Sequence, residues 1–168
     1  GDRVPKFEVD QYDVAIQITR NFTTPLEIFR EAIANAYDYG ADNINIRIQL
    51  SRLGDISSTL VEISDDGNGM VLFDDEISAG ENSGSLQSFL RIGSSISKTD
   101  TSKTGEKGLG IKVALRCRRL EVITKSYFGN KESYGVRCDE PLRALEQRML
   151  PPVERFDPDV ANGLEFKE

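Results

Sequence analysis

Three polar side chains that could do chemistry, Glu31, Asn35 and Asp38, lie at helical spacing between residues 26 and 40. At about 100° per residue they fall within one narrow stripe of a helix. From Ala32 to Gly40 the other side chains are small, apolar or aromatic, so the stripe is expected to face the interior. A buried carboxylate and amide require partners, and a ligand or metal ion would supply them. The alternative is an amphipathic helix whose polar stripe faces solvent.

Two glycine-rich segments follow this stretch. The first, Asp65-Asp66-Gly67-Asn68-Gly69-Met70, comes directly after a short strand-like alternation. The second, residues 105–112, contains three glycines and opens onto a helical pattern. Glycines before a helix let the backbone approach a ligand closely, and the helix N-terminus offers N–H donors to an anion. Either segment alone resembles a common loop. The indication of a ligand site therefore depends on the order and spacing of the two segments after the polar stripe.

The composition excludes several kinds of site. The 168 residues contain no histidine, which removes Ser-His-Asp and Cys-His catalysis and His-ligated zinc. No glycine is followed directly by lysine, so the GxxxxGK[ST] phosphate loop is missing. The net charge of −7 argues against a broad nucleic-acid-binding face, and residues 116–119 are expected to be a solvated helix end. Cys117 and Cys138 are expected to be free thiols.

The ordered motifs resemble those of the GHKL superfamily of ATP-binding domains, which includes gyrase B, the ninety-kilodalton heat-shock chaperones, MutL and histidine kinases. Residues 31–38 are similar to its N-box, and residues 65–70 and 105–110 to its two glycine boxes. The sequences of these motifs most resemble the MutL, microrchidia and heat-shock chaperone branch. The same holds for residues 91–98, Arg-Ile-Gly-Ser-Ser-Ile-Ser-Lys. The resemblance implies an α/β (α+β) two-layer sandwich, with a mixed, mostly antiparallel sheet and helices on one face. Residues 1–168 would form this single domain.

The resemblance also implies roles for the polar stripe. Glu31 would be the general base that accepts a proton from the attacking water, as a buried glutamate can near neutral pH. Asn35 would be a ligand to Mg²⁺, with phosphate oxygens and waters completing the octahedron. Asp38, one turn further along, would orient neighbouring groups.

The first glycine box would hold the base of ATP. Asp65 would accept a hydrogen bond from the adenine amine, and it is preferred to Asp66 because it restores the DxGxG spacing with Gly67 and Gly69. Met70 would pack against the adenine ring. An apolar residue at this position is equally ordinary in a protein core.

Phosphate-binding groups are expected in the second glycine box and in the segment before it. Residues 93–105, which are rich in hydroxyl side chains, resemble the ATP lid of the family, which would close over the nucleotide. The backbone of the glycines and the charge of the lysines would hold the phosphates. The candidate contacts are Ser95, Lys98, Gly105, Lys107, Gly108, Leu109, Gly110 and Lys112.

The function that these resemblances imply is a Mg²⁺-dependent ATPase, slow as an isolated domain, whose lid closure and nucleotide-dependent homodimerisation drive a larger machine. The alternatives are a kinase-type or regulatory ATP-binding module without hydrolysis, and a scaffold that binds no nucleotide. Glu31 favours the ATPase, because kinase-type relatives usually lack this glutamate. Leu164 stands where relatives often carry threonine, which puts a second adenine contact in doubt. We expect the protein to be cytoplasmic or nuclear. We also expect it to be a fragment that acts with C-terminal domains of a parent chain and binds neither membranes nor nucleic acid.

The secondary structure that must position these groups can also be predicted. Thr24 and Pro25 are typical of a helix start, and Gly40 of a helix end. Alternation of apolar residues from Ile44 to Leu50 predicts a strand buried on one face. Helices are expected at residues 11–20, 26–40, 73–80 and 85–92, strands at 44–50 and 59–64, and a hairpin from 120–127 and 133–138.

Overall fold

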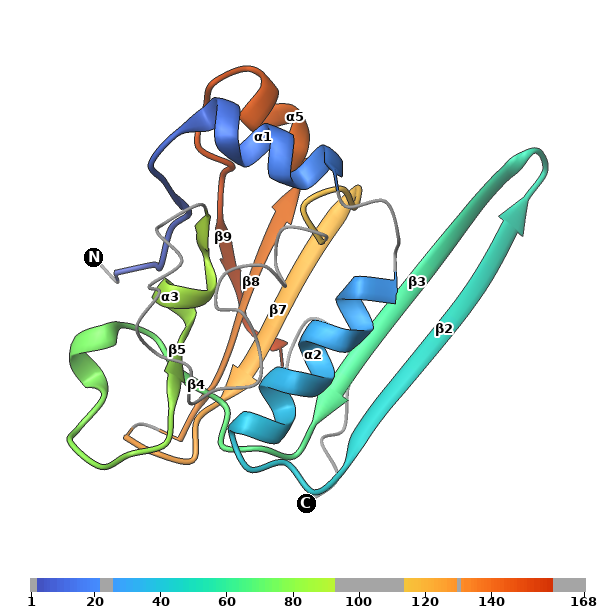
Figure 1. Cartoon of the computed structure of the whole chain (residues 1–168). Helices are drawn as coiled ribbons and strands as arrows, with labels where there is room; N and C mark the ends of the chain where they lie inside the picture. Colours follow the sequence, from blue (N-terminus) through green and yellow to red (C-terminus); the bar gives the residue numbers. More distant parts are fainter. Residues whose placement is uncertain (1–2, 22–25, 93–113, 130, 159–168) are drawn as a thin grey trace.

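The computed structural model describes residues 3–21, 26–92, 114–129 and 131–158 (Figure 1). A three-stranded antiparallel sheet lies at its centre, in the order β7 (Arg119–Lys125), β8 (Ser133–Asp139) and β9 (Glu154–Phe156). Alternate residues of β7 and β8 face the core, where Val122 is paired with Val136 and Leu120 with Cys138. This arrangement confirms the predicted hairpin.

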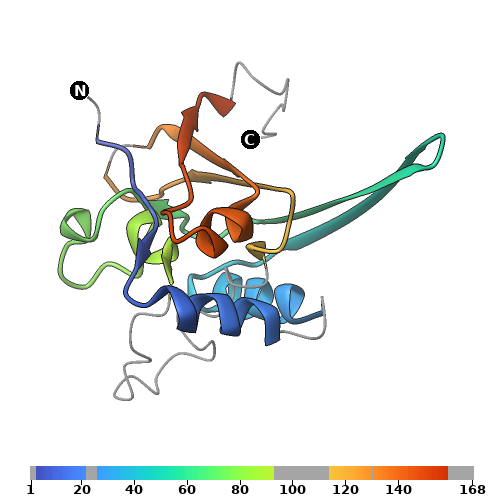
Figure 2. The same cartoon turned by 90° about the horizontal axis from the view of Figure 1, so that it is seen from above.

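Two helices pack on each other at one end of this sheet. They are α1 (Tyr12–Asn21) and α5 (Pro141–Glu146), which bring Ala15 and Leu145 into the core with no exposed surface. An ion pair of 3.3 Å between Arg20 and Glu146 also joins them. Figure 2 shows α1, α5 and α2 (Leu26–Asp38) on the same side of the three-stranded sheet. No described helix is long and apolar enough to cross a membrane.

The C-terminal end of α2 is closed by Gly40, as the sequence predicted. Gly40 has a φ of 80°, a conformation that glycine adopts without strain. Its N–H donates to the Tyr37 carbonyl at 3.1 Å, and the Ala41 N–H donates to the Ala36 carbonyl at 2.9 Å. These two bonds form the Schellman arrangement that commonly ends helices. The predicted start signals, Thr24 and Pro25, lie outside the described residues.

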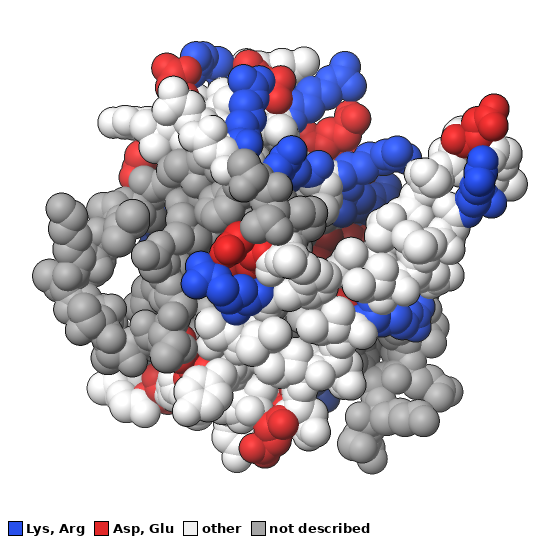
Figure 3. All heavy atoms as spheres, turned by 45° about the vertical axis from the view of Figure 1, so that its right-hand side comes forward, with Lys and Arg blue, Asp and Glu red and all other residues white. Residues whose placement is uncertain are grey.

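A long antiparallel hairpin, which we call the arm, follows α2. It consists of β2 (Ile44–Leu53) and β3 (Ile56–Asp65), paired over their whole length. Figure 1 shows the arm extending away from the rest of the molecule. Its apolar residues are therefore exposed, reaching 57% for Ile48 and 78% for Leu50, and the expected half-buried strand is wrong in this respect. Figure 3 shows a largely uncharged surface along the visible side of the arm, with charged side chains near its far end.

The segment after the arm is less helical than predicted. The expected helix at 73–80 is a single 3₁₀ turn, η1 (Asp74–Glu76), and the one at 85–92 is reduced to α3 (Leu86–Phe89). Their flanks form short parallel ladders instead. These ladders pair β4 (Met70–Val71) with β5 (Gly84–Ser85), and β1 (Glu8–Val9) with β6 (Arg91–Ile92).

The predicted α/β class with mostly antiparallel pairing is confirmed. Among the described residues the strands form four separate sheets. Three of their five ladders are antiparallel, and the other two are parallel ladders of only two residue pairs each. Cys117 and Cys138 are both free, as expected. Cys138 lies in the core, where burial raises the pKa of its thiol to about 11, so this thiol is unreactive at neutral pH.

Candidate functional site

Helix α2 places Glu31 and Asn35 one turn apart in different environments. Glu31 is buried at 4% exposure, and its Oε1 lies 3.4 Å from Nη2 of Arg30. Arg30 also forms a 2.9 Å ion pair with Glu27, one turn earlier on the helix. Asn35 is exposed and Asp38 is half-buried, so the expectation that the whole stripe faces the interior is wrong beyond Glu31. The helix thus offers a shielded carboxylate next to an accessible amide.

The first glycine box is docked against the C-terminal end of α2. The Asn68 N–H donates to the Tyr39 carbonyl at 2.9 Å, just beyond the last helical residue. Gly67 fits here because a Cβ at this position would lie 3.0 Å from the same carbonyl oxygen. The fold therefore brings together the two motifs that the sequence places about thirty residues apart.

The two adjacent aspartates of this box have different surroundings. Oδ1 of Asp66 accepts the N–H groups of Asp42 and Asn43, and its Oδ2 accepts the Asn43 side-chain amide, each at 2.8 Å. The side-chain bond from Asn43 is the main cause that lowers the pKa of Asp66 below its usual value. Asp65 is exposed, and its Oδ1 accepts the Gly67 N–H at 2.8 Å. Among the described residues its other oxygen has no hydrogen-bond partner, so Asp65 is the carboxylate with an oxygen available for a ligand.

The other side of the glycine box is held by the end of β7. The Met70 N–H donates to the buried Thr124 hydroxyl at 2.8 Å, and the Tyr127 N–H donates to the Asn68 carbonyl at 2.8 Å. Met70 is half-buried and packs against the hydrophobic core. Thr124 could not be identified from the sequence, because threonine is common in strands and its type alone does not indicate a site.

Gly69 is required by this contact with β7. Its φ is 67°, and a Cβ there would clash with the Lys125 carbonyl oxygen. Gly69→Ala is therefore expected to destabilise the fold by about 1–3 kcal/mol more than Gly80→Ala, because backbone must move to relieve the clash. Gly80 is the matched control, since its φ is 85° and no atom lies within 4 Å of the added Cβ. Equal melting temperatures for the two variants would contradict this explanation.

Several predicted contacts lie outside the described residues. They are the lid and second-glycine-box candidates Ser95, Lys98, Gly105, Lys107, Gly108, Leu109, Gly110 and Lys112, together with Leu164. The described part of the site therefore comprises the N-box and the first glycine box.

The described donors fit a magnesium ion that is held mainly by phosphate and water. The Asn35 amide oxygen is a hard ligand on an exposed side chain, and Mg²⁺ usually takes one or two protein ligands and keeps several waters. The described residues contain no group of three or more His, Cys, Asp or Glu side chains that could enclose a metal.

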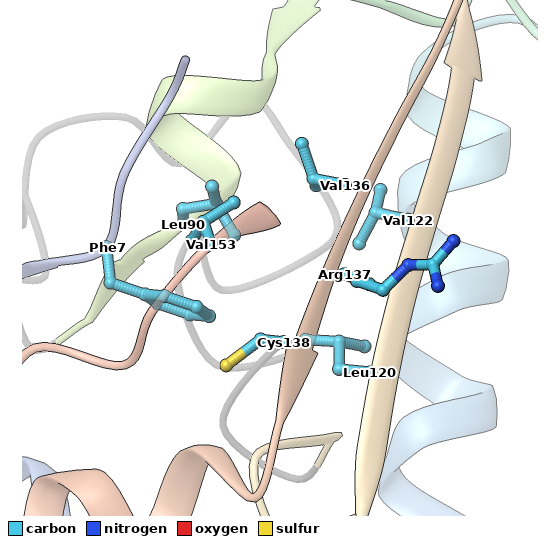
Figure 4. Close-up of a pocket in the computed structure, with 8 residues that line it drawn as sticks. All are labelled: Phe7, Leu90, Leu120, Val122, Val136, Arg137, Cys138 and Val153. Carbon is cyan, nitrogen blue, oxygen red and sulfur yellow. The ribbon is translucent and has the colours of Figure 1, made fainter. Parts of the chain in front are cut away.

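A small pocket in the core is not a nucleotide site. Its volume is about 10 Å³, close to the minimum for one water molecule. Figure 4 shows apolar side chains around it, while the guanidinium of Arg137 points away from the other residues. That guanidinium lies over the Phe156 ring, 4.3 Å from its centre. The lining residues are Phe7, Leu90, Leu120, Val122, Val136, Arg137, Cys138 and Val153.

One family model matches the part of the chain that carries the candidate site. A family model described as "Histidine kinase-, DNA gyrase B-, and HSP90-like ATPase" matches residues 22–137, which include α2 and both glycine boxes. Comparisons with curated proteins and with solved structures gave no match. Because the family match covers more than two thirds of the sequence, the chain belongs to the histidine kinase-, DNA gyrase B- and HSP90-like ATPase family, for which ATP binding is the expected property.

Proposed function

We propose that this domain binds ATP with Mg²⁺ and hydrolyses it. The observation that carries the proposal is Glu31, a carboxylate at 4% exposure placed one turn before the exposed Asn35. A general base for hydrolysis must lie close to the phosphates while being shielded from bulk solvent. In α2 the side chain of Glu31 is shielded from solvent, and the side chain of Asn35, one turn later, is accessible to a ligand.

In this proposal the residues of α2 handle the reacting end of ATP. Glu31 accepts a hydrogen bond from the attacking water and then takes its proton. Asn35 contributes its amide oxygen to Mg²⁺, and Asp38 orients groups beside it. Mg²⁺, when bound with ATP, would offset the charge that develops on the phosphate oxygens.

The first glycine box handles the adenine end. Asp65 has an available carboxylate oxygen that can accept a hydrogen bond from the adenine amine. Met70 offers its thioether beside the base, and its backbone is fixed by Thr124. Asp66 instead holds residues 42–43 in place. The phosphates would extend toward the residues of the second glycine box, Gly105, Lys107, Gly108, Leu109, Gly110 and Lys112.

Residues 93–105, which include Ser95 and Lys98, would act as a lid over the bound nucleotide. The support for this role is their sequence and their place between the two glycine boxes. Contacts to the γ-phosphate would make closure specific for ATP over ADP, because a ligand shifts an equilibrium by its differential affinity. Closure of the lid would favour formation of a homodimer. This conformational change would then be transmitted to other domains of the parent chain.

The proposal predicts Mg²⁺-dependent binding of ATP followed by slow release of phosphate. Calorimetry with a non-hydrolysable ATP analogue should give saturable binding that weakens when the metal is chelated. Sedimentation of the same samples should show dimers with the analogue and monomers with ADP. No binding at millimolar analogue would refute the proposal. Binding without phosphate release would favour a kinase-type or regulatory module.

A further inference from the structure

The loop before β5 touches both halves of the proposed site through one residue, Asn82. Its side-chain amide donates to the Asp38 carbonyl at 2.9 Å. Asp38 is the last residue of α2, and the final carbonyls of a helix lack partners within the helix. The Schellman bonds satisfy the carbonyls of Ala36 and Tyr37. Asn82 therefore satisfies the next one, from a position 44 residues further along the chain.

The same residue also binds the first glycine box. Its backbone carbonyl accepts the Asn68 side-chain amide at 3.0 Å. The Asn68 N–H in turn donates to the Tyr39 carbonyl, next to Asp38. The end of α2, the glycine box and Asn82 thus form a closed ring of hydrogen bonds, to which Asn82 contributes one acceptor and one donor.

The residues after Asn82 hold this ring against the core. Gly84 pairs in register with Met70 in the β4–β5 ladder, and Ser83 and Ser85 are buried at 8% and 2% exposure. Asn82 itself is exposed. Its side chain can therefore be changed while the buried residues that anchor the loop stay in place.

We propose that Asn82 is a positioning residue that sets the spacing between the two halves of the ATP site. One half is α2 with Glu31 and Asn35, and the other is the glycine box with Asp65. This inference rests on the proposed function, because it concerns how one ligand contacts both halves at once. When two contacts are held at the correct spacing, the second forms without a further loss of freedom. If the spacing between the two halves is less well fixed, a ligand that contacts both halves loses more affinity than a ligand that contacts only one.

Asn82→Ala is therefore expected to lower the affinity for an ATP analogue by about 2- to 12-fold, the equivalent of one hydrogen bond. The affinity for adenosine, which reaches only the glycine box, should stay within about twofold. Asn82→Asp should weaken the analogue at least as much, because a carboxylate cannot donate to the Asp38 carbonyl. Asn45→Ala is the matched control, since Asn45 is an exposed asparagine of the arm.

The test is calorimetry on the whole chain, with the ATP analogue and with adenosine, for the wild type and these three variants. Thermal melting and the amide exchange of the Asn68 N–H are measured in parallel. A selective loss for the analogue, with faster Asn68 exchange and little change in melting temperature, supports the proposal. Equal losses for both ligands, or an unchanged analogue affinity in both Asn82 variants, overturn it while leaving ATP binding intact. A wild-type chain that binds no analogue overturns this inference and the proposed function together.

Discussion

Replacing Glu31 with alanine is expected to lower ATP turnover by about 10²- to 10⁴-fold, the usual contribution of a positioned general base. The affinity for an ATP analogue should stay within a few-fold, because the lost carboxylate acts on water rather than on the nucleotide. Phosphate release under saturating ATP and calorimetry with the analogue measure the two quantities separately. Glu31→Gln should show the same separation, because it keeps the shape of the side chain and removes the proton acceptor.

Two other variants of α2 show whether the effect belongs to catalysis. Glu27→Ala is the matched control, because Glu27 is a second carboxylate that contacts Arg30, at 2.9 Å, and it has no proposed role with water. Its turnover should stay close to the wild-type value. Asn35→Ala should lower both binding and turnover, since the metal and the phosphates are held together. If Glu31→Ala lost binding as severely as Asn35→Ala, Glu31 would be a structural residue.

The sequence predicted α2 and its end well, because both depend on local interactions. Helical periodicity and the Gly40 stop signal depend on neighbouring residues, and the Schellman bonds involve residues at most five apart. The same periodicity could not tell how far along α2 the polar stripe would be covered. Glu31 is buried and Asn35 is exposed, and that difference depends on elements from other parts of the chain.

The arm shows a second limit of pattern reasoning. Alternation from Ile44 to Leu50 correctly predicted a strand, since successive side chains point to opposite faces. Alternation indicates a face that can be buried, but it does not state whether another element lies over it. In the structure the arm extends outward, so Leu50 is 78% exposed.

The residues that join the site were missed for a related reason. Asn82 acts through hydrogen bonds to Asp38 and Asn68, at sequence separations of 44 and 14 residues. A polar residue in a loop with glycine and serine normally predicts only a turn. The short ladders β1–β6 and β4–β5 likewise pair distant segments. They replace the helical conformation that local propensity suggested at both ends of residues 85–92.

Replacing Asp65 with asparagine is expected to lower the affinity for adenine nucleotides by about 10- to 150-fold. This corresponds to about 1.5–3 kcal/mol, the contribution of one hydrogen bond to a charged group. The asparagine can still accept the Gly67 N–H through its amide oxygen, so the turn itself should remain folded. Its amide nitrogen would then present a donor to the adenine amine, which is also a donor. Tripolyphosphate, which lacks the base, should bind the variant as it binds the wild type.

Asp66→Asn distinguishes the adenine contact from the structural aspartate. Asp66 has a lowered pKa in the folded chain, so its stabilisation is present above the usual aspartate pKa and is lost as the pH falls through the lowered value. The variant should melt at a lower temperature at pH 7, and its melting temperature should fall less than that of the wild type below about pH 4. Its affinity for adenine nucleotides should change less than that of Asp65→Asn. A larger affinity loss in Asp66→Asn than in Asp65→Asn would show that Asp66, and not Asp65, contacts the adenine. We expect the opposite, because the carboxylate of Asp66 already accepts three hydrogen bonds of 2.8 Å from residues 42–43.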